Sequence, residues 1–407
     1  MKSTCPYKQP ANSIQLTSRE SKRLFSLTFS AALVMTAQQG FGHPATGSHS
    51  RLEDRGITPY AVFATEFLSN VDGGIRNGTT APGLLDFGVE VDLEQLLGWQ
   101  GAGFTATAFA AYGDDGSAEN IGDFNVASNL FTDTDFNIFN LFVSQTFGDD
   151  FFYIKAGQIA ADDDFMGSET AGLFLNSAFG PLPTESGNVG APIFPLAAPG
   201  VFARVNPSDT FSFHAGIYAG DAGPVQSGNH GFDWRTGGAA GWVSFVEADY
   251  KYGSGTAKVG GYYHTGDFTN FSTNATEEGL GAIYAIIDHR FLEAADGGPG
   301  LSGFLRGSTV PQNERATVSH YFDGGLALDN LFREGDALGL GVSYTVFGDD
   351  YLAATPGVTS SETVLEMTYQ VAITDYWMIQ PDIQWILDSH EAQNDAFVVG
   401  VRTELTF

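Results

Sequence analysis

The feature that most constrains this chain is an alternation of apolar and polar side chains, which runs for about ten residues at a time. In the last segment, Val399, Val401 and Leu405 fall on one face, while Arg402 and Glu404 fall on the other. A period of two is that of a β-strand, whose successive side chains point to opposite faces. Soluble strands average about five or six residues, whereas a strand tilted across a bilayer needs about nine to eleven. The length favours a transmembrane barrel, although a two-sheet sandwich would also alternate.

About sixteen segments follow this pattern, and their connections alternate between short and long. Outer-membrane barrels have short periplasmic turns and longer outer loops. We therefore predict an all-β fold, a transmembrane antiparallel β-barrel of about 16 strands. The segments lie near residues 60–68, 84–95, 102–112, 136–147, 151–159, 199–206, 210–219, 238–252, 257–265, 280–288, 301–309, 317–328, 336–347, 362–373, 376–387 and 396–407.

The first 42 residues differ from the rest of the chain. They hold five of its 18 lysines and arginines, followed by an uncharged apolar stretch from Leu24 to Ala37. That stretch is too short to span a bilayer and has the length of a signal-peptide core. We expect residues 1–42 to be a cleaved signal peptide, 43–59 a polar leader and 60–407 the barrel. The expected location is the outer membrane of a Gram-negative bacterium.

Charge and cysteine content exclude other classes of protein. The formal net charge is -30, from 48 acidic against 18 basic residues. A nucleic-acid-binding protein needs a basic surface, so nucleic acid is not an expected partner. The single cysteine, Cys5, lies in the predicted signal, which excludes a disulfide scaffold. Aromatic residues make up 13% of the chain, far from the composition of a disordered acidic protein.

The longest connection, 160–198, is expected to fold into the lumen and narrow it. It contains a less polar stretch, 165–179, and a proline-rich one, 181–199, and such a loop is poorly suited to water. An exposed flexible loop is the alternative. Its acidic run, Asp162–Asp164, lacks the spacing of a Ca²⁺ loop and is expected to be solvated. The histidines show no metal-ligand spacing, so neither a metal nor a cofactor is expected.

The polar faces of the strands predict the lining of the lumen. Carboxylates and amides accept hydrogen bonds from hydroxyl groups, and aromatic rings stack on the C–H faces of sugars. Such a wall suits neutral polyhydroxyl solutes and cations and repels anions. The predicted lining residues are Glu66, Asp86, Glu90, Asp92, Lys155, His214, Tyr218, Lys258, Tyr262, Glu366, Gln370, Gln380, Asp382, Gln384, Arg402 and Glu404.

The C-terminal third resembles the closing strands of the carbohydrate-selective porin family (OprB-like). The resemblance rests on Glu366-Met-Thr-Tyr369, on Ile379-Gln-Pro-Asp-Ile-Gln384-Trp385 and on Val399-Gly-Val-Arg402 before the terminal Phe407. Earlier segments similar to the family are Leu85–Gly88, Leu97–Gly101 and Phe174–Gly180, the last of which includes Asn176.

This resemblance implies a sixteen-stranded barrel that admits monosaccharides by diffusion. It implies that Phe407 is the insertion signal read by the barrel-assembly machinery. Porins of this size are often trimers, so a homotrimer is an open expectation. The family lines its constriction with arginines, and this chain has few that could face inward, which puts sugar selectivity in question. They are Arg204, Arg235, Arg306 and Arg402.

The leading hypothesis is an outer-membrane porin, not an enzyme, for passive diffusion of small hydrophilic solutes, with sugars and outer-membrane lipid as partners. One alternative is a general cation-preferring porin without sugar selectivity. Another is a soluble secreted β-rich glycan-binding protein. A third is an outer-membrane enzyme or adhesin, although no G-x-S-x-G nucleophile motif occurs.

Overall fold

The two faces of each strand meet different surroundings. In the computed structural model, which describes residues 52–133, 136–225, 228–294 and 298–407, the outward side chains of Val259 and Leu305 are 65% and 67% exposed. Their inward neighbours Tyr262 and Arg306 are only 5% and 4% exposed. A soluble sandwich would turn its large apolar side chains inward. The observed arrangement is that of a barrel with a lipid-facing outer wall, so the interpretation as a soluble two-sheet protein is wrong.

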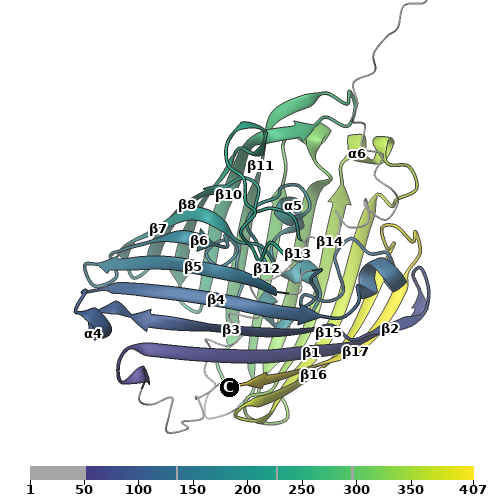
Figure 1. Cartoon of the computed structure of the whole chain (residues 1–407). Helices are drawn as coiled ribbons and strands as arrows, with labels where there is room; N and C mark the ends of the chain where they lie inside the picture. The colour runs from purple at the N-terminus through teal and green to yellow at the C-terminus, as the bar shows by residue number, and fades with distance from the viewer. Residues whose placement is uncertain (1–51, 134–135, 226–227, 295–297) are drawn as a thin grey trace, which may run out of the picture.

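Antiparallel strands form one continuous sheet, which closes on itself (Figure 1). Strands that follow one another in sequence also lie side by side in the wall. Their bounds are β1 Ile57–Gly73, β2 Gly78–Thr80, β3 Gly83–Asp92, β4 Ala102–Tyr112, β5 Phe136–Phe147, β6 Phe152–Ile159, β7 Ala198–Ser208, β8 Phe211–Ala219, β9 Trp242–Tyr252, β10 Gly255–Thr269, β11 Thr276–Leu292, β12 Gly300–Thr309, β13 Val318–Asp329, β14 Ala337–Phe347, β15 Ser361–Thr374, β16 Trp377–Leu387 and β17 Ala396–Thr406.

Pairing between the first and last strands closes the barrel. β1 pairs with β17 from Val62↔Thr406 to Gly73↔Ala396, and Glu66 faces Arg402 in this register. Closure pairs the backbone N–H and C=O groups that an open strand edge would leave free, as the interior of a bilayer requires. The short β2 pairs only with β1, at Leu68 to Asn70, whereas β3 pairs with β1 from Ile57 to Thr65. Without β2 the sheet of 17 strands is a sixteen-stranded barrel.

Each of the sixteen predicted segments coincides with a strand, so the predicted fold class is confirmed. The predicted strand 84–95 ends early, at Asp92. The Asp92 carboxylate accepts hydrogen bonds from the backbone N–H groups of Glu94 and Gln95, and this N-cap starts the helix α4 (Leu93–Leu97). The cap competes successfully with continued strand pairing.

The structure describes only part of the predicted N-terminal region. β1 begins at Ile57, inside the predicted polar leader 43–59. The predicted signal peptide, 1–42, and the leader up to residue 51 lie outside the described residues.

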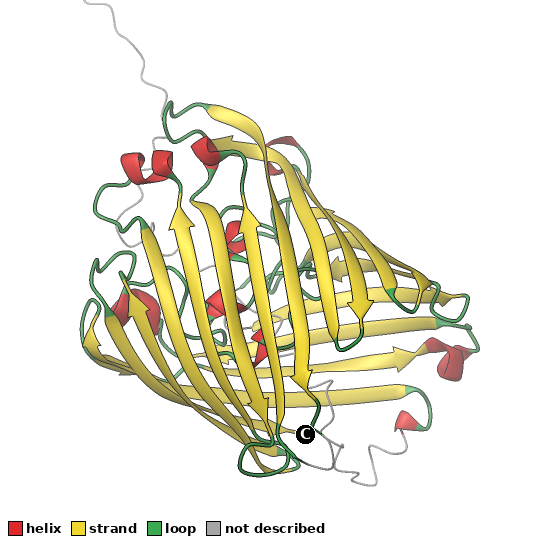
Figure 2. Ribbon diagram, turned by 180° about the vertical axis from the view of Figure 1, so that it is seen from behind, coloured by secondary structure: helices red, strands yellow, loops and turns green. Residues whose placement is uncertain are grey.

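Short turns lie at one end of the barrel and long loops at the other. Several loops at the long-loop end run back between the walls, where they carry short helices (Figure 2). None of the helices in the described ranges is both long and apolar enough to cross a membrane. Besides α4, the helical segments are η1 Ser117–Ile121, η2 Ala171–Leu173, η3 Ser177–Phe179, α5 Pro183–Ser186, η4 Gly238–Ala240, η6 Asn313–Arg315 and α6 Asp349–Ala354.

Candidate functional site

The lumen is the candidate site, and its wall carries most of the predicted lining residues. On β15 to β17, polar residues occupy the inward positions of the alternation, and Glu366, Gln384 and Arg402 are all buried there. The predicted residues that lie on polar, inward strand positions are Glu90 and Asp92 on β3, Lys155 on β6, Arg204 on β7, Tyr218 on β8, Tyr262 on β10, Glu366 and Gln370 on β15, Gln380, Asp382 and Gln384 on β16, and Arg402 and Glu404 on β17.

Four predicted lining residues lie away from the middle of the lumen. Asp92 caps α4 at the short-turn end. Arg204, near the same end, forms an ion pair of 2.6 Å with Asp150. Glu90 lies two residues before Asp92 on β3 and is exposed. Arg235 lies in the loop between β8 and β9, where it forms an exposed ion pair with Asp221. These side chains belong to the two mouths of the barrel.

The long loop 160–197, called L3 below, enters the lumen and docks on β15 and β16. Both carboxylate oxygens of Glu366 accept backbone hydrogen bonds from L3, at 2.6 Å from Leu175 and 3.0 Å from Asn176. The Asn176 side-chain amide in turn donates to Gln384 Oε1 at 2.9 Å, and Gln380 donates to the carbonyl of L3 Leu173. Asn176 is therefore a buried anchor of the loop, with no exposed surface.

A second anchor of L3 is an ion pair on β12 and β13. Arg306 binds Asp323 through Nε, at 3.0 Å from each carboxylate oxygen. Its remaining nitrogens donate to the L3 carbonyls of Gly180 at 2.7 Å and Ala178 at 3.1 Å. Tyr321 donates to the same Ala178 carbonyl. Arg306 faces inward as expected, but its guanidinium is bound to the Asp323 carboxylate and to carbonyls of L3.

The start of L3 docks on the opposite side of the ring, on β5 and β6. The Asp164 carboxylate pairs with Lys155 Nζ at 2.8 Å, and Asp163 accepts a hydrogen bond from Asn140 at 2.8 Å. Asp162 accepts the backbone N–H of Phe194. The expectation of a solvated acidic loop is therefore wrong, because all three carboxylates are drawn into the lumen. With docks on β5–β6 and on β15–β16, L3 crosses the channel and narrows it.

Burial changes the proton affinity of several groups in L3. Burial raises the pKa of Glu185 to about 8, and it raises the pKa of Asp162 well above its usual range. Burial also raises the pKa of Asp164, to about 6, although the neighbouring Lys155 acts in the opposite direction. Of these groups, Glu185 therefore ionises only above neutral pH.

A second loop, residues 113–133 (L2 below), also enters the lumen, and the sequence reasoning did not identify it. Glu362 on β15 accepts the backbone N–H groups of Phe124 at 2.7 Å and Asn125 at 2.8 Å. Asn129 donates its side-chain amide to the Phe174 carbonyl of L3 at 3.1 Å. Asn125 and Asn129 are buried in L2, and their side-chain amides donate hydrogen bonds to Glu362 and to the Phe174 carbonyl.

Arg402 joins the seam of the barrel to L2. Its Nε donates to Glu66 Oε1 at 2.7 Å, and a terminal nitrogen also contacts Glu66 and the Asn129 side-chain oxygen. Glu66 has no exposed surface. Like Arg306, this arginine is neutralised by a carboxylate and fixes a loop.

One cluster on the wall could hold a metal ion. Ligand atoms of His214 on β8 and of Glu247 and Asp249 on β9 lie within 4.8 Å of one another. This cluster was not predicted from the sequence, because the pairing of the two strands brings together residues more than thirty positions apart.

Comparisons with known proteins agree with this architecture. The model of a family described as "Carbohydrate-selective porin, OprB family" matches residues 76–407. "Porin B" of Pseudomonas aeruginosa is 22% identical over 417 residues, which cover 89% of this chain and 90% of that protein.

Solved porin structures share the fold. The structure described as "High pH structure of Pseudomonas putida OprB" has a TM-score of 0.81 at 18% identity and covers 89% of this chain and 96% of its own. The outer-membrane channel DcaP of Acinetobacter baumannii has a TM-score of 0.55 at 10% identity, covering 86% of this chain and 97% of its own.

Proposed function

The chain belongs to the carbohydrate-selective porin family, and on that premise we propose that its lumen lets small neutral sugars diffuse across the outer membrane. The protein is an outer-membrane porin by family and by fold. Family and fold also indicate a channel rather than an enzyme. The observation that carries the sugar proposal is the chemistry of the narrowed lumen.

The side chains around L3 are rich in hydrogen-bonding groups and carboxylates. The wall next to the loop carries amides, hydroxyls and carboxylates. Gln380 and Tyr262 donate to L3 carbonyls, and Asp382 accepts a hydrogen bond from Gln384, which binds the loop. Neutral polyhydroxyl solutes can exchange hydrogen bonds with water for hydrogen bonds with such a wall. The buried Arg306 and Arg402 are both paired with carboxylates, so they add little attraction for anions.

A general cation-preferring channel is the second candidate function, and the acidic excess of the chain favours it. Single-sign charge in a low-dielectric channel raises the local concentration of the opposite ion. The two candidates share this cation preference and differ in their handling of sugars.

Liposome swelling with solutes of graded size is expected to separate the two candidates. Vesicles containing the protein should swell faster in glucose than in a neutral non-sugar solute of matched size, and more slowly in disaccharides, because L3 narrows the path. Equal rates for glucose and the matched solute would leave only the general porin.

The ion selectivity of the same channel tests the charge argument. In planar bilayers with a salt gradient, the reversal potential should show cation preference, and it should weaken at high salt because the charges are screened. Anion preference would contradict the proposal that the acidic excess of the chain sets the ion preference of the channel.

Export by a cleaved signal peptide at 1–42 stays part of the proposal. N-terminal sequencing of the outer-membrane protein should find a start near residue 43, and a retained N-terminus would contradict it.

The last residue, Phe407, is proposed to be read by the barrel-assembly machinery. It is 58% exposed, and its backbone N–H bonds to Ala61 on β1 at the closing seam. Deleting Phe407 should lower the fraction of chains that reach the heat-modifiable, folded form in cells while leaving folding into detergent micelles intact. Unchanged assembly in cells would remove this role.

A homotrimer also stays a proposal. Mass measurement of the detergent-solubilised protein should give three copies per particle, and a single copy would contradict it.

A further inference from the structure

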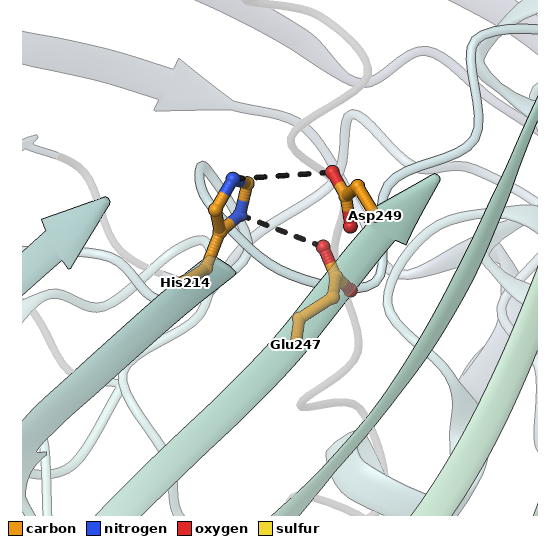
Figure 3. A group of neighbouring side chains, drawn as sticks. All are labelled: His214, Glu247 and Asp249. Atoms are coloured by element: carbon orange, nitrogen blue, oxygen red, sulfur yellow. Dashed lines mark ion pairs between the residues drawn. The ribbon is translucent and has the colours of Figure 1, made fainter. Parts of the chain in front are cut away.

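A histidine and two carboxylates meet on the inner wall beneath L3. His214 on β8 lies directly opposite Glu247 on β9, and Asp249 follows two residues later on the same face. Figure 3 shows the three side chains turned toward one another from adjacent strands. His214 Nδ1 lies 3.7 Å from Glu247 Oε1, and Nε2 lies 3.9 Å from Asp249 Oδ2.

Two oxygens of this cluster have no hydrogen-bond partner in the described part of the chain. Glu247 Oε1 and Asp249 Oδ1 are both buried without a hydrogen bond. The Glu247 side chain is only 1% exposed, and its free oxygen faces the imidazole. Leaving a buried carboxylate oxygen unpaired is costly, so this oxygen points to a missing positive partner.

The other Glu247 oxygen is already committed. Glu247 Oε2 accepts hydrogen bonds from the backbone N–H of L3 Met166 at 3.0 Å and from Tyr284 at 2.8 Å. These contacts hold the carboxylate in place and leave Oε1 directed into the cluster. Hydrogen bonds of this kind orient metal-binding carboxylates.

The imidazole is also oriented. His214 Nδ1 lies 3.3 Å from the backbone carbonyl of L3 Asp164, which favours a proton on Nδ1. Nε2 then carries the lone pair on the side of Asp249. The Ser212 hydroxyl lies 2.9 Å from Nε2 but donates its proton to Asn206 Oδ1, so it does not take up this lone pair. A hydrogen bond from one ring nitrogen to a carbonyl is the usual arrangement of a metal-binding histidine.

The neighbouring cations have partners outside the cluster. Lys258 on β10 lies opposite Asp249, and its ammonium group donates a hydrogen bond to the Gly167 carbonyl of L3 at 2.8 Å. Arg204, opposite His214 on β7, is paired with Asp150. Among the described residues neither cation makes an ion pair of 4.0 Å or less with Glu247 or Asp249.

We propose that His214, Glu247 and Asp249 form a binding site for one divalent transition-metal ion of the Zn²⁺ type, which fastens L3 to the wall. One imidazole nitrogen and two carboxylates are a ligand set that such ions accept, with open positions left for water. A tetrahedral ion needs ligand atoms about 3.4 Å apart, so the three side chains close slightly around it. The site is independent of the preferred solute.

The coupling to L3 follows from the shared contacts. The ion's ligands His214 and Glu247 also bind the L3 backbone at Asp164 and Met166. A bound ion stiffens these ligands and adds positive charge at the constriction. Zn²⁺ should therefore reduce the cation preference of the channel and its conductance fluctuations.

The test is titration of the folded, detergent-solubilised protein with Zn²⁺ in the presence of excess Mg²⁺, which saturates exposed carboxylates. We expect one tight site per chain, and X-ray absorption should show one imidazole among nitrogen and oxygen ligands. His214→Gln and Asp249→Asn should each weaken binding by at least the roughly 10–100-fold that a lost supporting contact costs. His289→Gln, on β11 and outside the cluster, is the matched control.

The channel readout uses the same variants. Zn²⁺ should lower the cation preference of the wild type, chelation should reverse this, and Asp249→Asn should not respond. Heat-modifiable mobility confirms that each variant is folded. Absence of a tight site, or a site that His214→Gln and Asp249→Asn leave intact, would overturn the proposal.

Discussion

Replacing Arg306 by methionine is expected to release L3 and raise the single-channel conductance severalfold. The guanidinium binds both oxygens of Asp323 on the wall and two carbonyls of the loop, Ala178 and Gly180. Its loss leaves a buried carboxylate unpaired, which costs roughly 3–5 kcal/mol. The loop loses two charge-assisted hydrogen bonds at the same time. Conductance in planar bilayers and the temperature of the heat-modifiable transition measure the two effects separately.

A double variant separates the loop anchor from the buried charge. Arg306→Met with Asp323→Leu removes both charges, and replacing a whole buried pair by apolar side chains is often neutral for stability. The transition temperature should therefore recover while the conductance stays high, because the Gly180 carbonyl of L3 still lacks its donor and the Ala178 carbonyl keeps only Tyr321. Arg76→Met is the control, since its ion pair with Glu119 is exposed and is worth about 0–1 kcal/mol. A folded Arg306→Met channel with wild-type conductance would show that Arg306 does not hold L3.

The wall of the barrel could be predicted because the bilayer imposes both of its patterns. A strand must cross the hydrocarbon and must present apolar groups on one side. Strand length and the alternation of apolar and polar residues can therefore be recognised in a single sequence. Local chemistry was harder to read. Asp92 looked like one more polar strand position, and its role as the cap of α4 depends on competition between side-chain and ladder hydrogen bonds.

The loops in the lumen were predicted only where they are apolar. The low polarity of residues 165–179 indicated that L3 leaves water. No burial was predicted for L2, although Asn125 and Asn129 are buried there. Their burial depends on Glu362 and Arg402, which come from the other end of the chain. The His214 cluster was missed for a related reason, since it exists only in the register of β8 with β9.

Raising the pH from acid to alkaline is expected to loosen L3 through Glu185. This residue lies in α5, has no exposed surface, and neither of its carboxylate oxygens has a hydrogen-bond partner among the described residues. Burial raises its pKa from 4.5 to about 8. Asp162, whose pKa burial also raises and the charge of Glu185 raises further, acts in the same direction.

The sign follows from the two states of the loop. Below a pH of about 4.5 Glu185 is protonated whether L3 is docked or released, so docking is at full strength. Between 4.5 and about 8 only the docked loop keeps the proton, so docking weakens as the pH rises. The total loss is roughly 5 kcal/mol, since each pKa unit corresponds to about 1.4 kcal/mol.

Glu185→Gln is expected to flatten this pH dependence, because a neutral amide of the same shape needs no proton. Conductance noise and protease cleavage within L3, measured from acid to alkaline pH, should rise with pH in the wild type and far less in the variant. Glu169→Gln, on the exposed part of the same loop, is the control and should keep the wild-type profile, because it removes one carboxylate without touching the buried one. The contribution of Asp162 should remain as a smaller slope of the same sign. A wild-type profile in Glu185→Gln would show that L3 docking does not depend on this proton.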